Sequence, residues 1–372
     1  MDTTITSHIN IPKYEYKLSD YLDRSIVIYG PSGSGKSTII LNILKYLNGK
    51  INMAIVYSPT EPSNKNYTGI IDPAMILYEI KMVNASKTTK KRNEEAELIE
   101  YMQNLFDYQT ARMKTYKMAN DIKTLSKLVA KIKSNDKHKC KDIVEQINSH
   151  RVQAIKDIEV RYSHNNAQMA SEISKIDAKF NEYIIDIFKQ YIKLNEKQLW
   201  DEKLTEAEIN AIKFIEFNPR ILLIFDDCAD MLEKAFKNKV FSALFFRGRH
   251  AGITFIMSMQ SYGTMPKRFR TNAFISIFTK AESMNSFFEN DNNFSKQLKK
   301  KIIDSSSDIF VGYRKCVYIR DDNSGNNFYH MTFPMLEKFR FGSRALHEYC
   351  DKIQIKDMKM TNDNKYYKNF MS

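Results

Sequence analysis

Short runs of apolar residues, bounded by polar turns, occur in both the first and the last third of the chain. Uninterrupted runs of this kind are typical of strands that are buried on both faces of a parallel sheet. They span residues 26–29, 53–57, 221–225, 253–257 and 274–278. Between the first two runs, apolar residues recur at helical spacing from Ile39 to Leu47, and Asn48-Gly49 ends that helix. The chain therefore opens as strand, turn, helix and strand, which predicts an α/β fold.

The same patterns predict the remaining elements of this α/β part. Helical spacing predicts helices at residues 74–82, 231–247, 281–301 and 336–349. Short β-rich runs predict strands at residues 308–313, 315–320 and 328–333, and the polar residues 321–327 predict the turn of a hairpin between the last two. We therefore expect a mostly parallel central sheet with a small C-terminal β-hairpin region.

A long segment without Gly or Pro separates the two groups of strands. Residues 74–218 contain neither residue type, and polar breaks lie at residues 134–139 and 163–166. A weaker apolar seam runs through Leu98, Met102, Leu105, Leu125, Leu128 and Ile132, and the clearest one runs through Met169, Ile173, Ile176, Phe180, Tyr183, Ile187, Tyr191 and Leu194. We expect a large all-helical insertion at residues 84–218, folded as a hairpin or small bundle. It would divide one domain into residues 1–83 and 219–345, with a polar tail at 346–372.

A glycine-rich turn follows the first predicted strand and opens the first predicted helix. Its sequence, GPSGSGKST, fits a phosphate-binding loop of the Walker A type. The glycines let successive backbone N–H groups point inward, Lys36 brings a positive charge to the β- and γ-phosphates, and Ser37 can place its hydroxyl on Mg²⁺. The predicted nucleotide-binding residues are Gly30, Pro31, Ser32, Gly33, Ser34, Gly35, Lys36, Ser37 and Thr38.

Polar side chains also follow two later strands, where open α/β sheets bind their ligands. Asp226 and Asp227 end the run ILLIF, and Gln260 follows the run that begins at Ile253. We expect Asp226 to hold Mg²⁺ with Ser37, and Asp227 to orient or deprotonate the attacking water. Gln260 is predicted to hydrogen-bond the γ-phosphate or that water. With Lys36, these residues form the predicted catalytic set.

Several arginines are candidates for a finger that reaches the phosphates of a neighbouring subunit. Arg247 and Arg249 lie at the end of the helix before the Gln260 strand, and the basic turn PKRFR contains Arg268 and Arg270. We select Arg249 for this role. A cation that complements the dipole at a helix C-terminus is the alternative explanation for Arg247 and Arg249.

Charge and composition limit the partners and the compartment. The net charge is +13, of which the segment 84–218, with 24 Lys and Arg against 21 Asp and Glu, holds only +3. The surplus therefore belongs to the predicted nucleotide-binding parts and favours a polyanionic partner. The four cysteines are widely scattered, which predicts free thiols in a reducing compartment. We expect no signal peptide and no membrane insertion, because neither the first residues nor any later stretch has a sufficient apolar run.

Four motifs taken together resemble a known viral family. They are GPSGSGKST, ILLIFDDC, FRGRHAGITFIMSMQ and PKRFRTNAFISIF, in that order. The set resembles the DNA-packaging ATPases of poxviruses and other nucleocytoplasmic large DNA viruses, which belong to the FtsK and HerA group of P-loop translocases. The resemblance covers roughly residues 20–80 and 219–345, and residues 249–260 are its most specific part. Residues 84–218 match no family that we recognise.

The resemblance implies a P-loop NTPase sheet in which the Gln260 strand lies between the strands of Lys36 and Asp226. It implies phosphate binding by residues 30–37, metal binding by Asp226, a catalytic acid at 227 and a sensor at 260. This chain has Asp227 where the wider group more often has Glu, a side chain one methylene longer. The implied protein is a homo-oligomeric ring that hydrolyses ATP with Mg²⁺ and pumps double-stranded DNA into a capsid, with capsid or other packaging proteins as partners. It would act in the host cytoplasm, at the viral factory, and in the virion.

Two other functions fit parts of the pattern. An SMC or Rad50-like DNA clamp also separates its nucleotide motifs by long helices, but residues 212–220 lack the serine-glycine signature which that class requires. A nucleotide-dependent switch without motor activity would use the helical insertion to dock a partner protein. Because the chain has no Asn-Lys-x-Asp motif of GTPases, ATP is the expected nucleotide.

Overall fold

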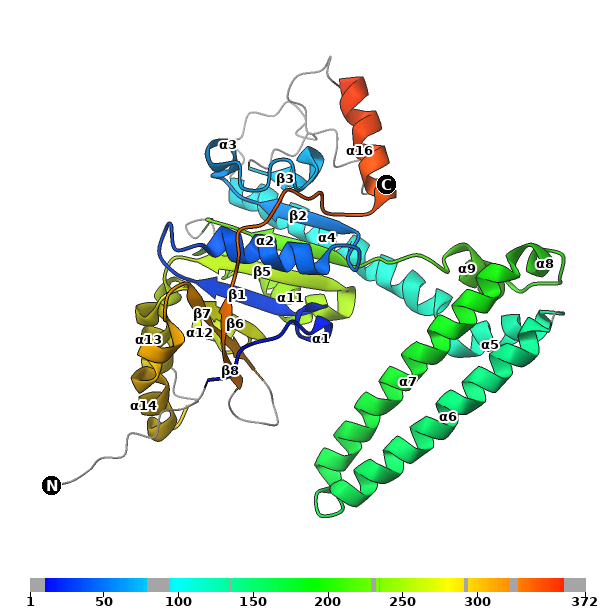
Figure 1. Ribbon diagram of the computed structural model, residues 1–372. Helices are drawn as coiled ribbons and strands as arrows, with labels where there is room; N and C mark the ends of the chain where they lie inside the picture. The colour runs from blue at the N-terminus through cyan, green and yellow to red at the C-terminus, as the bar shows by residue number, and fades with distance from the viewer. Residues whose placement is uncertain are drawn as a thin grey trace. The chain divides into compact units, whose positions relative to one another are not determined.

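The computed structural model (Figure 1) divides into two compact units. The sheet unit comprises Met1–Ala111 and Pro219–Ser372, and the helical unit comprises Arg112–Asn218. The border between them falls inside helix α4 (Glu94–Ala119). The structure describes residues 11–78, 94–133, 135–228, 232–233, 235–290, 294–320 and 327–357. The finer division into four segments with a border at residue 84 stays a prediction.

The sheet unit is built on one eight-stranded sheet with the order β3-β2-β4-β5-β1-β6-β7-β8. All neighbouring pairs from β3 to β6 are parallel, whereas β7 is antiparallel to both β6 and β8. The strands are β1 (Ser25–Tyr29), β2 (Met53–Tyr57), β3 (Ile76–Leu77), β4 (Ile221–Phe225), β5 (Ile253–Met259), β6 (Ile275–Phe278), β7 (Arg314–Ile319) and β8 (Asn327–Thr332). The predicted α/β fold with a mostly parallel sheet and a C-terminal hairpin is confirmed.

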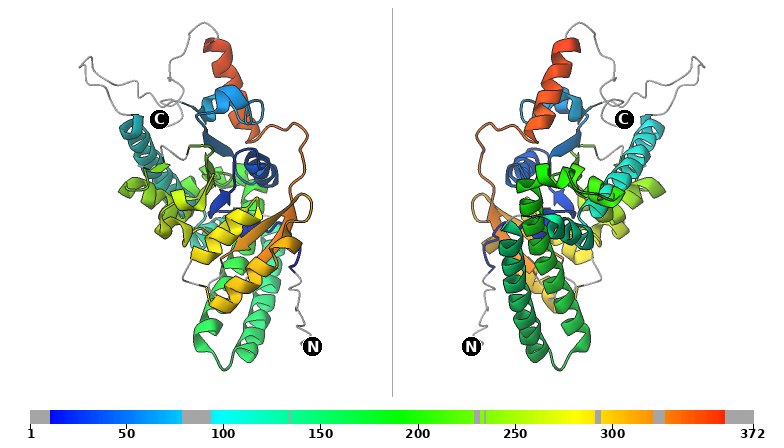
Figure 2. Two further views of the ribbon diagram at one scale, coloured as in Figure 1. Left: turned by 90° about the vertical axis from the view of Figure 1, so that its left-hand side faces the viewer. Right: turned by 90° about the vertical axis from the view of Figure 1, so that its right-hand side faces the viewer.

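Helices cover both faces of this sheet. Helix α2 (Lys36–Leu47) lies on one face, and α11 (Lys239–Arg247) with the part of α4 up to Ala111 lies on the other, as the turned views in Figure 2 also show. Because both faces are covered, β4 and β5 are buried along their whole length. The apolar face predicted for α2, from Ile39 to Leu47, is buried in the same core.

The sheet unit contains further helices and helical turns. They are α1 (Leu18–Tyr21), α3 (Glu61–Asn64), η1 (Pro73–Met75), η2 (Gly248–Ala251), η3 (Tyr262–Thr264), α12 (Lys267–Arg270), α13 (Ala281–Asn290), α14 (Lys296–Asp304), α15 (Ser306–Ile309) and α16 (Arg344–Asp357). The predicted excursion at residues 281–301 is thus helical within the described residues, as α13 and α14.

Two predicted helices near the sheet are wrong in part. Residues 74–77 form the turn η1 and the edge strand β3 rather than a helix, because the backbone of Val56 and Tyr57 pairs with Ile76 and Leu77. Residues 79–82 of that prediction lie outside the described residues. The helix predicted at 231–247 is interrupted by a turn, and α11 begins only at Lys239, where Asn238 caps it by accepting a hydrogen bond from the Val240 N–H.

Two predictions near the C-terminus are also wrong. Residues 308–313 do not form a strand: α15 continues into a turn in which Gly312 has φ 61°. The helix predicted to begin at residue 336 begins at Arg344, where the Ser343 Oγ accepts a hydrogen bond from the Leu346 N–H. Consequently, α16 occupies residues 346–357 of the predicted polar tail, and the remainder of that tail lies outside the described residues.

The residues between β8 and α16 form an extended strap (residues 333–343) that passes α2 (Figure 1). Asn42 of α2 donates to the Pro334 carbonyl at 2.9 Å, and Asn48 donates to the Arg340 carbonyl at 3.1 Å. Further along the strap, the Phe341 N–H donates a hydrogen bond to the Ile70 carbonyl, between α3 and η1, at 2.8 Å. The strap therefore fastens the helix that follows the glycine-rich turn.

The helical unit has its own small core. It contains the end of α4 with α5 (Ile122–Lys131), α6 (Asp136–Arg161), α7 (Asn166–Leu194), α8 (Glu196–Trp200) and α9 (Glu206–Lys213). Helices α6 and α7 pack side by side as the predicted hairpin, linked by an Arg151–Asp177 ion pair of 2.8 Å. Within the described part of the chain, no helix combines the length and the apolar character needed to cross a membrane.

The predicted seams differ from the observed ones in detail. Helix α7 buries Ile184, Phe188 and Ile192, whereas Tyr183 and Leu194 of the predicted seam are 46% and 77% exposed. The weaker seam is buried but divided, since Leu98, Met102 and Leu105 join the core of the sheet unit, and Leu125, Leu128 and Ile132 join that of the helical unit.

Candidate nucleotide-binding site

The glycine-rich turn lies between the carboxyl end of β1 and the first turn of α2. Gly33 and Gly35 have φ angles of 71° and 91°, a region that side chains with a Cβ rarely adopt, and Gly35 is the residue from which α2 begins. Gly30 is needed for a different reason, because a Cβ there would lie 1.7 Å from the Thr279 Oγ1. The turn thus directs the N-terminus of a helix, with its unpaired N–H groups, toward the edge of the sheet.

Lys36 is enclosed by this turn. Its ammonium donates hydrogen bonds to the carbonyls of Gly30, at 2.9 Å, and Pro31, at 3.0 Å, and the side chain is buried. Burial lowers the pKa of Lys36, and the negative charges of Asp226 and Asp227 partly oppose that effect. The three residues predicted to surround one phosphate are therefore close enough to interact electrostatically.

Asp226, directly after β4, has a buried carboxylate that accepts hydrogen bonds from three hydroxyl groups. The Ser37 Oγ donates to its Oδ2 at 3.1 Å, the Tyr67 hydroxyl donates to the same oxygen at 2.8 Å, and the Ser258 Oγ donates to Oδ1. The two residues predicted to hold a metal, Ser37 and Asp226, are thus in direct contact although 189 positions separate them.

Asp227 and Gln260 also lie together. The Gln260 Nε2 donates to the Asp227 Oδ1 at 3.1 Å, and the backbone N–H of Asp227 donates to the Ser258 Oγ at 3.1 Å. Asp227 has φ 54°, a backbone conformation that residues other than glycine rarely adopt, so the chain turns sharply directly after β4. As the resemblance implied, β5 lies between β1 and β4. Because these strands are parallel neighbours, the groups that follow them lie together at the carboxyl ends of the strands.

The arginine candidates lie elsewhere. Arg249 belongs to η2, which precedes β5, so about seven residues of strand, or roughly 20 Å, separate it from the edge where Gln260 lies. Arg247 lies over the Phe106 ring at 5.9 Å. Arg268 donates to the Phe236 carbonyl, and Arg270 donates to the Tyr262 carbonyl at 3.4 Å. The structure therefore does not bring Arg249 to the Lys36 group of its own chain.

Sequence reasoning missed the loop that follows β2. Asn66 donates to the Ser37 Oγ at 3.3 Å, and Tyr67 contacts Asp226 as described above. The buried Glu61 carboxylate fixes this loop by accepting the backbone N–H groups of residues 66, 67 and 68. Burial and the Asp226 charge hold the pKa of Tyr67 well above its usual range, so the phenol stays a donor. The sequence signal that could have identified this loop is its position after the carboxyl end of β2, a parallel strand.

The Tyr67→Phe variant should raise the Mg²⁺ concentration required for half-maximal ADP affinity. The substitution keeps the ring but removes the hydroxyl that donates to Asp226, and we expect a change of about ten- to a hundredfold, in line with outer-shell effects on metal sites. The measurement is ADP titration at a series of Mg²⁺ concentrations. Tyr183→Phe in the helical unit is the control, and equal Mg²⁺ dependence in both variants would contradict the role of Tyr67.

All four cysteines are free, as predicted, and all four are buried. Cys228 is close to the candidate site, two residues beyond Asp226, and burial together with the charge of Asp226 holds the pKa of its thiol well above the usual range. The thiol is therefore protonated at neutral pH and packs as a small apolar group.

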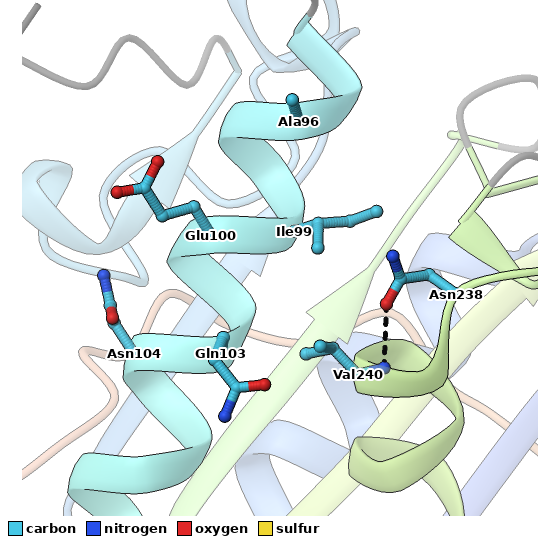
Figure 3. Close-up of a pocket in the computed structure, with 7 residues that line it drawn as sticks. All are labelled: Ala96, Ile99, Glu100, Gln103, Asn104, Asn238 and Val240. Carbon is cyan, nitrogen blue, oxygen red and sulfur yellow. Dashed lines mark hydrogen bonds between the residues drawn. The ribbon is translucent and has the colours of Figure 1, made fainter.

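A separate hollow of about 560 Å³ lies between α4 and the start of α11 (Figure 3). Ile99 extends from α4 toward the side of Asn238 and Val240, and Glu100 extends away from it. None of the residues of the candidate nucleotide site lines this hollow. The hollow is therefore distinct from the candidate nucleotide site at the carboxyl ends of the parallel strands, where Lys36 and Asp226 lie.

Comparison with known proteins places the chain among viral proteins. The family model "Poxvirus A32 protein" matches residues 173–327, which include Asp226, Asp227 and Gln260. Protein B354L of African swine fever virus (isolate Tick/Malawi/Lil 20-1/1983) is 33% identical over 373 residues, covering 98% of this chain and 98% of the relative. B354L of the isolate Pig/Kenya/KEN-50/1950 is also 33% identical, over 375 residues, with 100% and 99% covered.

Solved structures give weaker likenesses. EssC (ATPases 2 and 3) from Geobacillus thermodenitrificans has a TM-score of 0.35 at 10% identity, covering 91% of this chain and 45% of that one. The genome packaging NTPase B204 from Sulfolobus turreted icosahedral virus 2 has a TM-score of 0.33 at 14% identity, covering 84% and 99%. The identity to B354L, in contrast, extends over nearly the whole of both chains, and from it we conclude that this protein belongs to the family of African swine fever virus protein B354L.

Proposed function

We propose that this protein is an Mg²⁺-dependent ATPase that drives viral double-stranded DNA into capsids. The observation that carries the catalytic part is the meeting of Lys36, Ser37, Asp226, Asp227 and Gln260 at one edge of the sheet. Residues 30–38 would bind the phosphates of ATP, with the backbone N–H groups and the Lys36 ammonium as donors. The motif resemblance to packaging ATPases, together with the match of residues 173–327 to the Poxvirus A32 family model, supports the packaging role.

The residues at this edge suit magnesium. Mg²⁺ prefers oxygen ligands, and the Ser37 hydroxyl and the Asp226 carboxylate provide two oxygens that already contact each other at 3.1 Å. The ion, when bound, would neutralise charge that develops on the phosphates. Asp227, held by Gln260, would orient or deprotonate the attacking water, and Gln260 would respond to the presence of the γ-phosphate.

The DNA partner is inferred from charge. Of the net charge of +13, +10 lies outside residues 84–218, so most of the basic excess lies outside the predicted helical insertion. Such an excess attracts phosphate backbones. Since Arg249 lies far from the candidate site of its own chain, a role as a finger requires a neighbouring copy, as a ring would provide. Capsid proteins as partners, and action at the viral factory in the host cytoplasm, belong to the same proposal.

ATP turnover measured with and without duplex DNA tests the proposal. Turnover that rises on addition of duplex DNA supports a translocase, whereas tight ATP binding with turnover indifferent to DNA supports a nucleotide-dependent switch. Absence of ATP turnover under all of these conditions would overturn the catalytic part of the proposal.

DNA affinity should fall steeply as salt is added. If the protein neutralises about six phosphates, the affinity for duplex DNA should drop about a thousandfold between 50 and 200 mM salt, because counterion release drives such binding. Fluorescence anisotropy of a labelled duplex measures this slope. A sequence-scrambled duplex of equal length is the control, since backbone contacts do not distinguish sequences. Salt-independent binding would contradict recognition through phosphates.

A further inference from the structure

Two lysines lie beside the glycine-rich turn, on the side opposite to Asp226. Lys280 follows β6 and Lys315 is the second residue of β7, and we refer to them as the lysine pair. Strand β6 is parallel to β1, whereas β7 is antiparallel to β6, with Phe278 opposite Cys316. The amino end of β7 therefore lies at the same edge as the carboxyl ends of the parallel strands, where the nucleotide motifs lie.

Thr279 connects the lysine pair to the glycine-rich turn. The Thr279 Oγ1 donates to the Ser34 Oγ at 2.8 Å and lies so close to Gly30 that no side chain fits there. The Lys315 ammonium donates to the carbonyl of the same Thr279 at 3.2 Å. A single residue thus separates this ammonium from the turn that would hold the phosphates, and Lys280 is its neighbour in the chain.

Within the part of the chain that the structure describes, the lysine pair has no acidic partner. Lys315 is partly buried, and this burial, followed by the positive charge of Lys280, lowers its pKa. Lys280 itself is exposed. Two like charges held close together, one of them partly removed from water, are unfavourable unless an anion joins them.

We propose that the lysine pair binds an inner phosphate of the nucleotide. This phosphate lies closer to the nucleoside than the phosphate held by Lys36. This inference rests on the proposed nucleotide binding and deepens it. The sheet order places Asp226, Asp227 and Gln260 on β4 and β5, to one side of the turn, and the lysine pair on β6 and β7, to the other side. A nucleotide whose terminal phosphate faces the aspartates extends its inner phosphates away from them, toward the lysine pair.

A nucleotide phosphate fits this place better than a DNA phosphate. Lys315 is hydrogen-bonded to Thr279, which is itself buried and packed against Gly30, and Lys280 follows Thr279 in the chain. Lys315 is also partly desolvated before any ligand is bound. It therefore belongs to the wall of the nucleotide site, beside the exposed Lys280.

The test compares ADP binding by the full-length wild-type chain and by the double variant Lys280→Met and Lys315→Met. Methionine keeps the length of the side chain but removes its charge. We expect the Kd for ADP, measured by isothermal titration calorimetry with Mg²⁺, to rise about tenfold, the loss of one charge-assisted contact. Lys197→Met, an exposed lysine of the helical unit, is the matched control and should leave the Kd unchanged. Thermal unfolding verifies that each variant is folded.

Binding of a short duplex DNA by the same variants separates the two sources of phosphate. A weaker ADP affinity with unchanged DNA affinity supports the proposal. Weaker DNA binding with unchanged ADP affinity assigns the lysine pair to nucleic acid and overturns it, and so does an unchanged Kd for both ligands. If the wild-type chain itself bound no ADP, the proposed function would fail. If Lys36→Ala lost ADP binding and the double variant did not, only the inference about the lysine pair would fail.

Discussion

ATP turnover by the Lys36→Ala variant should fall by about a hundredfold or more, because losing one preorganised donor to developing charge typically has an effect of this size. Lys36 is the only cation enclosed by residues 30–37, and its ammonium is held by two carbonyls of the same turn. Truncation removes that charge without altering the glycines that shape the turn. The measurement is phosphate release under saturating ATP and Mg²⁺.

Lys45→Ala is the matched control for this experiment. Lys45 lies on the same helix, α2, but in its last turn, where its ammonium lies 4.9 Å from the Phe339 ring. We expect this variant to keep the wild-type rate. If Lys36→Ala also kept that rate, the phosphates would be held by other groups, and the assignment of residues 30–38 as the nucleotide-binding turn would be wrong.

Asp227→Asn should bind nucleotide normally and turn it over about a hundred- to ten-thousandfold more slowly, the range expected for loss of a general base. The substitution is conservative for geometry. An asparagine Oδ1 can still accept the hydrogen bond from Gln260, and asparagine tolerates the φ of 54° at this position. What it lacks is a basic carboxylate. ADP affinity and single-turnover hydrolysis, measured together, separate binding from chemistry.

Asp23→Asn provides an unusually close comparison. Asp23 also has a positive φ, 58°, but it precedes β1 at the other edge of the sheet and forms an ion pair with Arg220 at 2.9 Å. It should retain wild-type turnover. Wild-type turnover by Asp227→Asn would exclude Asp227 as the base, and loss of ADP affinity in that variant would instead indicate a role in binding.

Most of the central sheet could be predicted from the sequence, because its strands are apolar runs that only a two-sided core accommodates. The run at residues 221–225 is an example, since it is buried along its whole length. Elements at the margin of the sheet were predicted less well. Residues 76–77 are a strand only because β2 offers an unpaired edge, and residues 308–313 have the composition of a strand but no strand to pair with. Local patterns do not contain that information.

The candidate site shows the same division. The residues with a recognisable motif, such as Lys36 and Asp226, could be identified, since their spacing relative to strands and turns is fixed by local geometry. Asn66, Tyr67 and Lys315 could not, because their contacts depend on which loops the folded sheet brings together. Arg249 is selected as a finger that reaches a neighbouring subunit, and its place before β5, far from the site of its own chain, leaves that role a prediction.

The strap at residues 333–343 has a consequence for biosynthesis. Hydrogen bonds from Asn42 and Asn48 reach residues that are 292 positions later in the chain. During synthesis, helix α2 therefore leaves the ribosome long before the strap is made. For most of translation it lacks the hydrogen bonds that the strap provides. A nascent chain that stalls before residue 343 would expose this helix, and recognition by chaperones during synthesis is expected to concentrate there.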